Sequence, residues 1–493
     1  MSAERSWKIY LVAIAIICLL AGIGIGWVVK PPKEVTPPGY EEMQAKINEY
    51  EYMIEYFRHR LTSQPSAMIC TLEEAETPWG SIWYMVENDV RPDVETYKEW
   101  LTELLGKPPE EVTGTLVVGA WAGLGREDEK WWNEGEWGFH KIFPNVEVKW
   151  VYFEDEPDLR AKLELDPEWA DVIEVCGSQW KLIEAGYLAP LDPSLIPLLA
   201  EFMPEWLLHY AFWYDNKLYG VLIEWGQSSL AYRTDIFEEL GIYDKYPQYF
   251  EGKVAVDWGL LFEPIPELEG KLWMYDSVVE IMPAAIAYAA GTDYWDIPLM
   301  VEWTLDPVKW EQVKQVMYNF RPKIAKFFIG VEEAYTALTT GEAAGVFCWN
   351  DMYAAGVFGP DWELGTGDEA PVAWMMPIPC DSWGTAYCLN SRLQDDPTMW
   401  IVAHVFLNAL ADPLANMYKI GDWFEGAPNK YAWDMVIDYY AEWGPEYAET
   451  IAEVIKEMRL NDTYYYTVEG SYWIEPPDEI IQIWEEFWLE FKG

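Results

Sequence analysis

The fold is decided by the stretch between residues 115 and 175, where short apolar runs alternate with a helical segment. The runs are Thr115-Leu-Val-Val-Gly119, Val146 to Phe153 and Asp171-Val-Ile-Glu-Val175, and a helix is predicted around Pro157 to Leu165. Short runs rich in Val and Ile are typical of strands, and strands that alternate with helices form a sheet covered by helices. The stretch therefore predicts an α/β fold class.

The same rhythm returns later in the chain and predicts a second α/β unit. Similar runs occur at Lys271-Leu-Trp-Met-Tyr275, Gly345-Val-Phe-Cys-Trp349 and Pro371-Val-Ala-Trp-Met375. Hydrophobic residues make up 51% of the chain, so two cores can be filled, and we expect two lobes. A last helix is predicted to present one apolar face, formed by Ile480, Ile481, Trp484, Phe487, Trp488 and Phe491.

An uncharged apolar segment near the N-terminus predicts a membrane anchor in residues 1–30. The segment runs from Ile9 to Val29 and is long enough to span a bilayer as a helix. A cleaved secretory signal is the alternative, because Ala21-Gly22 could be cut. Positive charges on both sides of the segment leave its orientation open.

Two further segments separate the anchor from the main body. Residues 31–63 form a Pro-rich spacer and then a coiled-coil-like helix with apolar residues at steps of four and three. This apolar stripe either drives self-association, together with the GxxxG spacing of Gly22–Gly26, or packs on the body. Residues 64–113 are predicted to be a helical adaptor, with a helix from Val94 to Leu105 that stops at Gly106. The stripe consists of Met43, Ile47, Tyr50, Ile54, Phe57 and Leu61.

The charge of the chain excludes some partners and favours others. It has 84 acidic residues against 33 lysines and arginines, a formal net charge of −51. Such a chain repels nucleic acids and anionic lipid surfaces and attracts cationic solutes. The alternative is that most of these acids only keep the surface hydrated.

No sequence motif for catalysis or for metal binding is present. The body has no GxxxxGK[ST], HExxH or GxSxG motif and no Gly-rich dinucleotide turn. Its six cysteines form no CxxC pair and its four histidines are scattered. We expect a protein that is not an enzyme and that uses no cofactor or metal; a surface hydrolase with an acid pair is the catalytic alternative.

Short segments follow one another in a characteristic order along residues 114–435, namely Gly114 to Trp121, Phe143-Pro-Asn-Val-Glu-Val148, Ala161-Lys-Leu163, Ala170-Asp-Val-Ile173, Glu184-Ala-Gly-Tyr-Leu188, Pro190-Leu-Asp192, Tyr219-Gly-Val221, Glu224-Trp-Gly226, Tyr232 to Phe237, Trp258 to Pro264, Gly270 to Ser277, Gly341-Glu342, Trp349-Asn350, Ser382-Trp383, Ala403 to Leu410, Asp412-Pro413 and Ala427-Pro-Asn429. This order resembles the extracellular solute-binding proteins of ABC importers, and its middle part looks like their spermidine/putrescine-binding branch. The resemblance implies a two-lobed periplasmic-binding-protein-like fold of type II, with a ligand trapped between the lobes and delivered to a membrane permease. It also implies that the body faces the cell exterior.

The resemblance assigns segments to the two lobes. Lobe 1 is expected to contain residues 114–223 and about 384–425. Lobe 2 is expected to contain residues 224–383 and about 426–493. The ligand would lie where the lobes face each other.

The resemblance also implies which residues bind the ligand. An amine that leaves water needs carboxylate acceptors, and its methylene or methyl groups favour aromatic faces, which attract the cation as well. Acids interleaved with tryptophans meet both needs, although any single tryptophan can instead belong to the core. The residues implied are Trp121, Glu224, Trp225, Asp276, Glu280, Trp349, Asn350, Asp351, Trp383, Thr385 and Trp423.

Asp276 and Glu280 are the most informative pair of this set. Four residues apart on an entering helix, their carboxylates would share one face and meet neighbouring amines. Alternatively, Asp276 only caps that helix. Ser277 and Thr385 depart from the branch, which carries acids at both places, so a shorter or quaternary amine and a neutral sugar are alternatives to a polyamine.

Two functions from different classes follow from the sequence. The first is a membrane-tethered extracellular protein that captures a small cationic, polyamine-like solute for an ABC permease. The second is a surface structural protein that keeps a binding-protein body, while residues 9–62 assemble it into an array.

Overall fold

The computed structural model describes residues 65–493 except 360, 361, 363 and 470. The predicted anchor, spacer and coiled-coil stripe lie outside the described residues. Within the described part of the chain, no helix alone is long and apolar enough to cross a membrane. α18 (Pro397–Leu410) and α19 (Pro413–Trp423) reach that length and composition only as a pair, with a bend of 52° between them.

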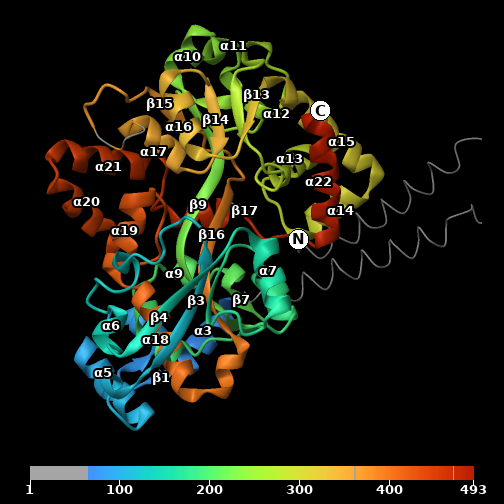
Figure 1. The fold of residues 1–493 in the computed structure, drawn as a ribbon. Coiled ribbons are helices and arrows are strands. Elements are labelled where there is room, and N and C mark those ends of the chain that lie inside the picture. The colour runs from blue at the N-terminus through green and yellow to red at the C-terminus, as the bar shows by residue number, and fades with distance from the viewer. Residues whose placement is uncertain (1–64, 360–361, 363, 470) are drawn as a thin grey trace, which may run out of the picture. The chain divides into compact units, whose positions relative to one another are not determined.

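Strands of both predicted α/β units join one sheet, which has eleven strands among the described residues (Figure 1). They are β3 (Gly114–Trp121), β4 (Val146–Phe153), β5 (Val172–Val175), β6 (Leu188–Ala189), β9 (Gly220–Arg233), β12 (Leu272–Tyr275), β13 (Ile324–Phe328), β14 (Gly345–Cys348), β15 (Val372–Trp374), β16 (Asp381–Asn390) and β17 (Ser471–Tyr472). The main path is β13-β12-β14-β9-β16-β5-β3-β4. The six runs predicted as strands correspond to β3, β4, β5, β12, β14 and β15, so the α/β fold class is confirmed.

The strands β9 and β16 connect the two halves of this sheet. Residues 220–228 of β9 pair antiparallel with β16, and residues 229–233 pair with β14 and β15. Residues 386–390 of β16 continue the sheet to β5 and β6. We call the part built on β3 to β6 lobe 1 and the part built on β12 to β15 lobe 2. The register of β9 and β16 shifts between Thr385 and Ala386, an irregularity of the kind that bends a strand pair.

Lobe 1 is built on parallel strands that are covered by helices. β3 has parallel partners on both sides, and its residues Leu116, Val118 and Ala120 are fully buried. Asp155 caps the helix that joins β4 to β5, because its carboxylate accepts the N–H of Asp158 at 2.8 Å. The smaller elements of this region are η2 (Glu129–Trp131), α6 (Phe139–Ile142), α7 (Glu156–Leu165), α8 (Gln179–Glu184), η3 (Pro193–Leu195), η4 (Pro197–Glu201), α9 (Pro204–Leu207), η5 (Tyr210–Phe212), β7 (Trp213–Tyr214), β8 (Lys217–Leu218) and η9 (Ser391–Asp395).

The region predicted as an adaptor packs on lobe 1. α5 (Val94–Leu105) has the predicted bounds, and Gly106 ends it at φ 68°, a left-handed conformation that suits glycine. The buried Tyr97 of this helix donates its hydroxyl to the carbonyl of Leu195 at 2.6 Å. The other elements here are α3 (Pro65–Glu74), β1 (Glu76–Thr77), β2 (Gly80–Ser81), α4 (Ile82–Asn88) and η1 (Pro109–Glu111).

Lobe 2 surrounds its parallel strands with helices of its own. β12 lies between β13 and β14, and β14 is buried along its whole length. The elements of this region are α10 (Thr234–Glu239), α11 (Ile242–Lys245), η6 (Pro247–Tyr249), β10 (Phe250–Glu251), β11 (Val254–Ala255), α12 (Gly259–Phe262), η7 (Pro266–Leu268), α13 (Met282–Ala290), α14 (Ile297–Leu305), α15 (Pro307–Phe320), η8 (Arg321–Lys323), α16 (Val331–Thr340) and α17 (Asp351–Phe358).

The last residues of the chain contact both lobes, and we call Ser471–Lys492 the C-terminal strap. It begins with β17, which pairs with β16. Glu475 then forms ion pairs with two cations of lobe 1, at 2.7 Å from Arg160 and 3.0 Å from Lys181. Ion pairs therefore attach this part of the strap to lobe 1. The elements between α19 and the strap are α20 (Ala432–Ala441), α21 (Pro445–Glu457) and a π-helical turn (Tyr465–Glu469).

The strap ends in α22 (Asp478–Lys492), the predicted last helix, which packs on lobe 2. Its apolar face is buried as expected, except that Ile481 is only partly covered. Trp484 is fully buried and donates its indole N–H to the hydroxyl of Thr304 on α14 at 2.8 Å. The strap thus joins the two lobes by contacts additional to the pairing of β9 with β16.

Trp484→Ala should lower the free energy of unfolding by about 3–5 kcal/mol, because it leaves a large cavity and an unpaired hydroxyl under the strap. Denaturant-induced unfolding measures this loss. Leu489→Ala on the same helix is the control, since Leu489 is 71% exposed and its removal should change stability by no more than about 0.5 kcal/mol. Equal losses for both variants would contradict the packing of α22 on lobe 2.

Candidate functional site

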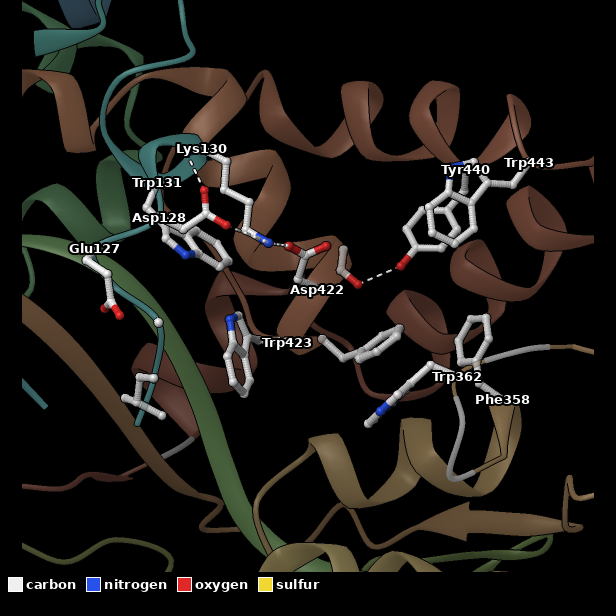
Figure 2. A pocket seen from close by; sticks show the side chains of 14 residues that line it. Glu127, Asp128, Lys130, Trp131, Phe358, Trp362, Asp422, Trp423, Tyr440 and Trp443 are labelled. Carbon is white, nitrogen blue, oxygen red and sulfur yellow. Dashed lines mark hydrogen bonds and ion pairs between the residues drawn. The ribbon is translucent and has the colours of Figure 1, made fainter. Parts of the chain in front are cut away.

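A cavity of about 530 Å³ lies between residues of lobe 1, lobe 2 and the helices that follow β16. The loop after β3 and η2 contribute from lobe 1, and the end of α17 contributes from lobe 2. The end of α19 and the end of α20 complete the wall (Figure 2). A volume of this size suits one small molecule. The lining includes Glu127, Asp128, Lys130, Trp131, Phe358, Trp362, Asp422, Trp423, Phe424, Tyr440 and Trp443.

Aromatic rings form most of this wall. Phe424 stacks on Trp362 with 5.3 Å between ring centroids and an interplanar angle of 15°, and it lies 5.2 Å from Phe358. Phe424 also ends α19 at φ 55°, a conformation that costs a non-glycine residue roughly 1–2 kcal/mol. The packing of its ring offsets this strain. Strained residues held in place by packing are a feature of binding sites.

The charged part of the lining contains three carboxylates, those of Glu127, Asp128 and Asp422, and one ammonium group, that of Lys130. The Nζ atom of Lys130 lies 2.6 Å from an Asp422 oxygen and 3.9 Å from an Asp128 oxygen. The same atom is 4.8 Å from the ring centroid of Trp131. The lining therefore has an excess of negative charge, and its cation rests on an aromatic face.

A buried cluster of charges adjoins the cavity at β9. Glu224 accepts a hydrogen bond from Lys419 Nζ at 3.0 Å and another from Arg126, which also donates to Glu174 at 3.0 Å. None of these four side chains belongs to a residue that is more than 3% exposed. Lys419 lies 4.4 Å from the ring centroid of Trp131, which links the cluster to the cavity. Buried charges need such partners, because desolvation without pairing is costly.

This cluster fixes the protonation of its acids. Burial would raise the pKa of Glu224, but Arg126 and Lys419 lower it to about 2. Burial and the charge of Glu224 raise the pKa of Glu425 well above its usual value. Glu224 is therefore ionised at neutral pH, whereas Glu425 keeps its proton to a higher pH than an ordinary glutamate does.

Trp423 is the predicted ligand-binding residue that lines the cavity. Glu224 lies in the adjoining cluster, where two cations of the chain already occupy its carboxylate. Trp121 is the last residue of β3, and its backbone N–H donates a hydrogen bond to the carboxylate of Glu174 at 2.9 Å. The structure thus brings these three residues to one region, but only Trp423 reaches the cavity.

A further group of predicted residues meets around β9. Glu280 accepts a hydrogen bond from the indole of Trp349 at 3.2 Å and one from a serine of β9. Asn350 and Trp383 flank Gly226, where an added Cβ would come within 2.4 Å of both side chains. This group does not line the cavity.

Two predicted residues, Asp351 and Thr385, are tied into the interior of the protein. Asp351 begins α17 and accepts the hydroxyl of Tyr335, and burial raises its pKa to about 6. Thr385 is buried on β16 opposite Glu224. Neither residue is part of the cavity wall.

Trp225 is a core residue in this structure. Successive residues of a strand point to opposite faces, so Trp225 faces away from its neighbour Glu224. It is fully buried, and it stacks on Trp206 with 4.6 Å between ring centroids. Trp225 therefore packs in the core, which was the alternative to a ligand contact for each tryptophan.

Asp276 and Glu280 do not share a helix, contrary to the prediction. α13 begins one residue before Pro283, which suits the first turn of a helix, and the preceding residues form turns. Nor does Asp276 cap α13. It accepts hydrogen bonds from Lys492 Nζ at 2.7 Å and from the indole of Trp488 at 2.8 Å, both in the C-terminal strap. A lysine of the chain therefore binds the carboxylate that was expected to bind a ligand amine.

Most of the cavity residues were not predicted from the sequence. They come from segments that no periodicity or motif connects. The adjacent acid and tryptophan at Asp422 and Trp423 match the pattern expected of an amine site, but only Trp423 was predicted from the sequence as a ligand-binding residue. The residues missed are Glu127, Asp128, Lys130, Trp131, Phe358, Trp362, Asp422, Phe424, Tyr440 and Trp443.

Glu224→Gln should lower the free energy of unfolding at pH 7 by about 3–5 kcal/mol, because it leaves Arg126 and Lys419 buried with too few partners. The pKa of Glu224 in the folded state, about 2, lies below its ordinary value of 4.5. Its stabilisation is therefore present above about pH 4.5 and is lost as the pH falls toward 2. Unfolding curves of both proteins should converge over this range.

Glu267 offers a matched control for that experiment. Hydrogen bonds from Lys245 and Tyr246 also lower its pKa to about 2, but this group lies at the surface. Water screens such a pair, so Glu267→Gln should cost much less stability than Glu224→Gln. Equal losses would contradict the role assigned to burial.

Comparison with solved structures shows the fold. The spermidine/putrescine ABC transporter substrate-binding protein PotD from Streptococcus pneumoniae is similar at 14% identity and a TM-score of 0.53, over 77% of this chain and 99% of that chain. A putative spermidine/putrescine ABC transporter from Listeria monocytogenes gives 16% identity and 0.52, over 77% and 98%. An ABC transporter substrate-binding protein from Bradyrhizobium japonicum gives 16% and 0.52, over 77% and 100%. The chain thus has a periplasmic-binding-protein-like fold.

Comparison with protein families shows the family. No curated protein matches the chain. Residues 139–404, more than half of the sequence, match the family described as bacterial extracellular solute-binding protein. Such proteins bind a solute and do not act as enzymes. The chain belongs to this family of bacterial extracellular solute-binding proteins.

Proposed function

We propose that this protein captures a small cationic solute in the cavity and delivers it to an ABC permease. One observation carries the proposal: the lining combines seven aromatic rings and three carboxylates with a single ammonium group. Aromatic faces attract a cation within about 6 Å, by roughly 0.5–2 kcal/mol for each well-placed ring. Carboxylates replace the hydration that the cation loses on entry.

The charge of the whole chain supports the same ligand class. A net charge of −51 raises the concentration of cations near the protein and speeds their encounter with it. Anionic solutes would meet repulsion both at a distance and in the cavity. The solute we propose is therefore an amine.

A polyamine-like solute is the first candidate among the amines. Its methylene groups could lie on the stacked rings of Phe424 and Trp362, with ammonium groups at the carboxylates of the lining. Two similar structures are named for spermidine and putrescine, but at 14% and 16% identity the choice of ligand rests on the cavity. Glu224 and Asp276, which were expected to bind the amine, already hold cations of the chain. We propose Glu127, Asp128 and Asp422 in their place.

A neutral sugar is the second candidate. The observation that favours it is the ion pair of Lys130 and Asp422, which offers a donor and an acceptor beside the rings of the lining. Sugar hydroxyl groups could bind both charged groups without separating them. The two candidates differ in their response to salt, because only the binding of a charged solute is screened.

Solute capture would use the connection between the lobes. Trp131 belongs to lobe 1 and Trp362 to lobe 2, so a solute in the cavity touches both. Such contacts favour the closed arrangement of the lobes, and a permease could recognise that arrangement. The predicted anchor at Ile9–Val29 would keep the protein at the outer face of the membrane.

Calorimetric titration of the full-length protein in detergent with spermidine, putrescine, betaine and maltose tests the proposal. We expect saturable binding of an amine that weakens as salt rises from low to moderate concentration. Trp423→Ala should weaken it about 10-fold, because the cation loses an aromatic face.

Trp303→Ala is the matched control for this titration. Lys309 lies over the Trp303 ring at 5.5 Å, but this tryptophan is remote from the cavity lining. Its replacement should leave amine affinity unchanged. Salt-independent binding of maltose alone would replace the amine by a sugar, and binding of none of the four solutes would overturn the cationic assignment.

A further inference from the structure

We infer that the ammonium group of Lys130 occupies the place of the solute's cation in the cavity and competes for Asp422 until a cationic solute displaces it. The inference rests on the proposed function and deepens it, because it names the residue that limits how tightly an amine binds. It predicts that removal of Lys130 improves the binding of amines.

The surroundings of the Lys130 ammonium group are those that a solute amine would need. Its Nζ atom lies 2.6 Å from an oxygen of Asp422. The ring centroids of Trp131 and Tyr418 are 4.8 Å and 6.0 Å away. Figure 2 shows the Lys130 side chain reaching toward Asp422 along the lining of the cavity. The carboxylate of Asp422, the more distant one of Asp128 at 3.9 Å and two aromatic faces thus surround a cation that belongs to the protein.

Lys419 provides a contrast, because it also lies on Trp131 but cannot be displaced at low cost. Its side chain is 3% exposed, and it is bound to Glu224, which Arg126 holds as well. The side chains of Lys130 and Asp422 are 29% and 27% exposed. Separating Lys130 from Asp422 therefore costs less than separating Lys419 from Glu224, although the Asp422 oxygen that Lys130 contacts is itself covered and needs a new cation.

The local fold allows Lys130 to leave. It lies on η2, a single 3-10 turn, and its backbone is anchored on one side by Trp131, which is buried. The long lysine side chain can rotate toward water without moving that turn. Partly exposed ion pairs contribute little net stability, so a solute amine can compete for Asp422.

Displacement of Lys130 depends on the charge of the solute. While Lys130 is paired, the cavity offers a neutralised Asp422 to any entering solute. Only a solute with its own cation can replace the lysine and keep the carboxylate satisfied. A neutral solute would leave the pair intact, and an anionic one would meet Glu127 and Asp128. Amines, which must displace Lys130 from Asp422, therefore bind less tightly than they would without it, whereas neutral solutes do not meet this competition.

The test is Lys130→Met in the full-length protein, titrated with spermidine, putrescine and maltose by calorimetry. Methionine keeps an apolar stem of similar length on Trp131 and removes the competing charge. We expect amines to bind roughly 3- to 10-fold more tightly than to the wild type at low salt, with a smaller gain at moderate salt. Affinity for maltose should not rise. Thermal unfolding of both proteins shows whether the variant is folded.

Lys326→Met is a matched control. Lys326 forms the same kind of contacts away from the cavity, with its Nζ 2.6 Å from a Glu333 oxygen and 4.2 Å from the ring centroid of Trp273. Both variants lose one positive charge, so both change the net charge of the protein equally. Amine affinity should change less than 2-fold in Lys326→Met, which separates local competition from long-range attraction.

Each outcome decides between the inference and the proposed function. If the wild type binds an amine and Lys130→Met binds it equally or more weakly, the inference is wrong and the proposed function stands. If only Lys130→Met binds an amine, no amine displaces Lys130 in the wild type, so the displacement that we infer and the proposed function both fail. If neither protein binds an amine, both statements fail. Equal gains in Lys130→Met and Lys326→Met would also overturn the inference.

Discussion

The antiparallel pairing of β9 with β16 is the constraint on which the rest of the structure depends. Every other strand of the main sheet lies on one side or the other of this pair, so its register positions lobe 1 and lobe 2 together. β9 is buried along almost all of its length, and its alternation puts Glu224 on one face and Trp225 on the other. One face thus carries ion pairs beside the cavity, and the opposite face carries the aromatic core.

Several of the chain's few cations neutralise carboxylates in the interior of the protein. The chain has few cations, yet it places Arg126, Lys419 and Lys492 on interior or partly buried carboxylates. These carboxylates are the ones that the resemblance to polyamine binders marked for a ligand. The cavity lining itself contributes the carboxylates of Glu127, Asp128 and Asp422, of which Asp422 is paired with Lys130.

The sequence predicted six of the eleven strands of the main sheet and the ends of α5, and it failed where contacts are long-range. Local rules suffice for α5, because Gly106 ends it, and for the six predicted strands, because apolar runs form them. The resemblance led to Glu224, but its partner Lys419 is 195 residues away and could not be inferred. The prediction for Asp276 and Glu280 failed because α13 begins only at Met282, next to Pro283, so neither acid lies on that helix. The cavity is lined by residues from four distant segments of the chain, and Trp423 is the lining residue that was predicted from the sequence.

The C-terminal strap is synthesised after the two lobes that it contacts. Ser471–Lys492 follows every strand of both lobes in the chain, so its contacts from Glu475 to lobe 1 and from Trp484 to lobe 2 form after both lobes have been made. During translation the lobes can therefore fold before the strap is present. A ribosome that stops before residue 471 releases a chain with both lobes but without the contacts of the strap, which a protease could distinguish from a chain that carries them.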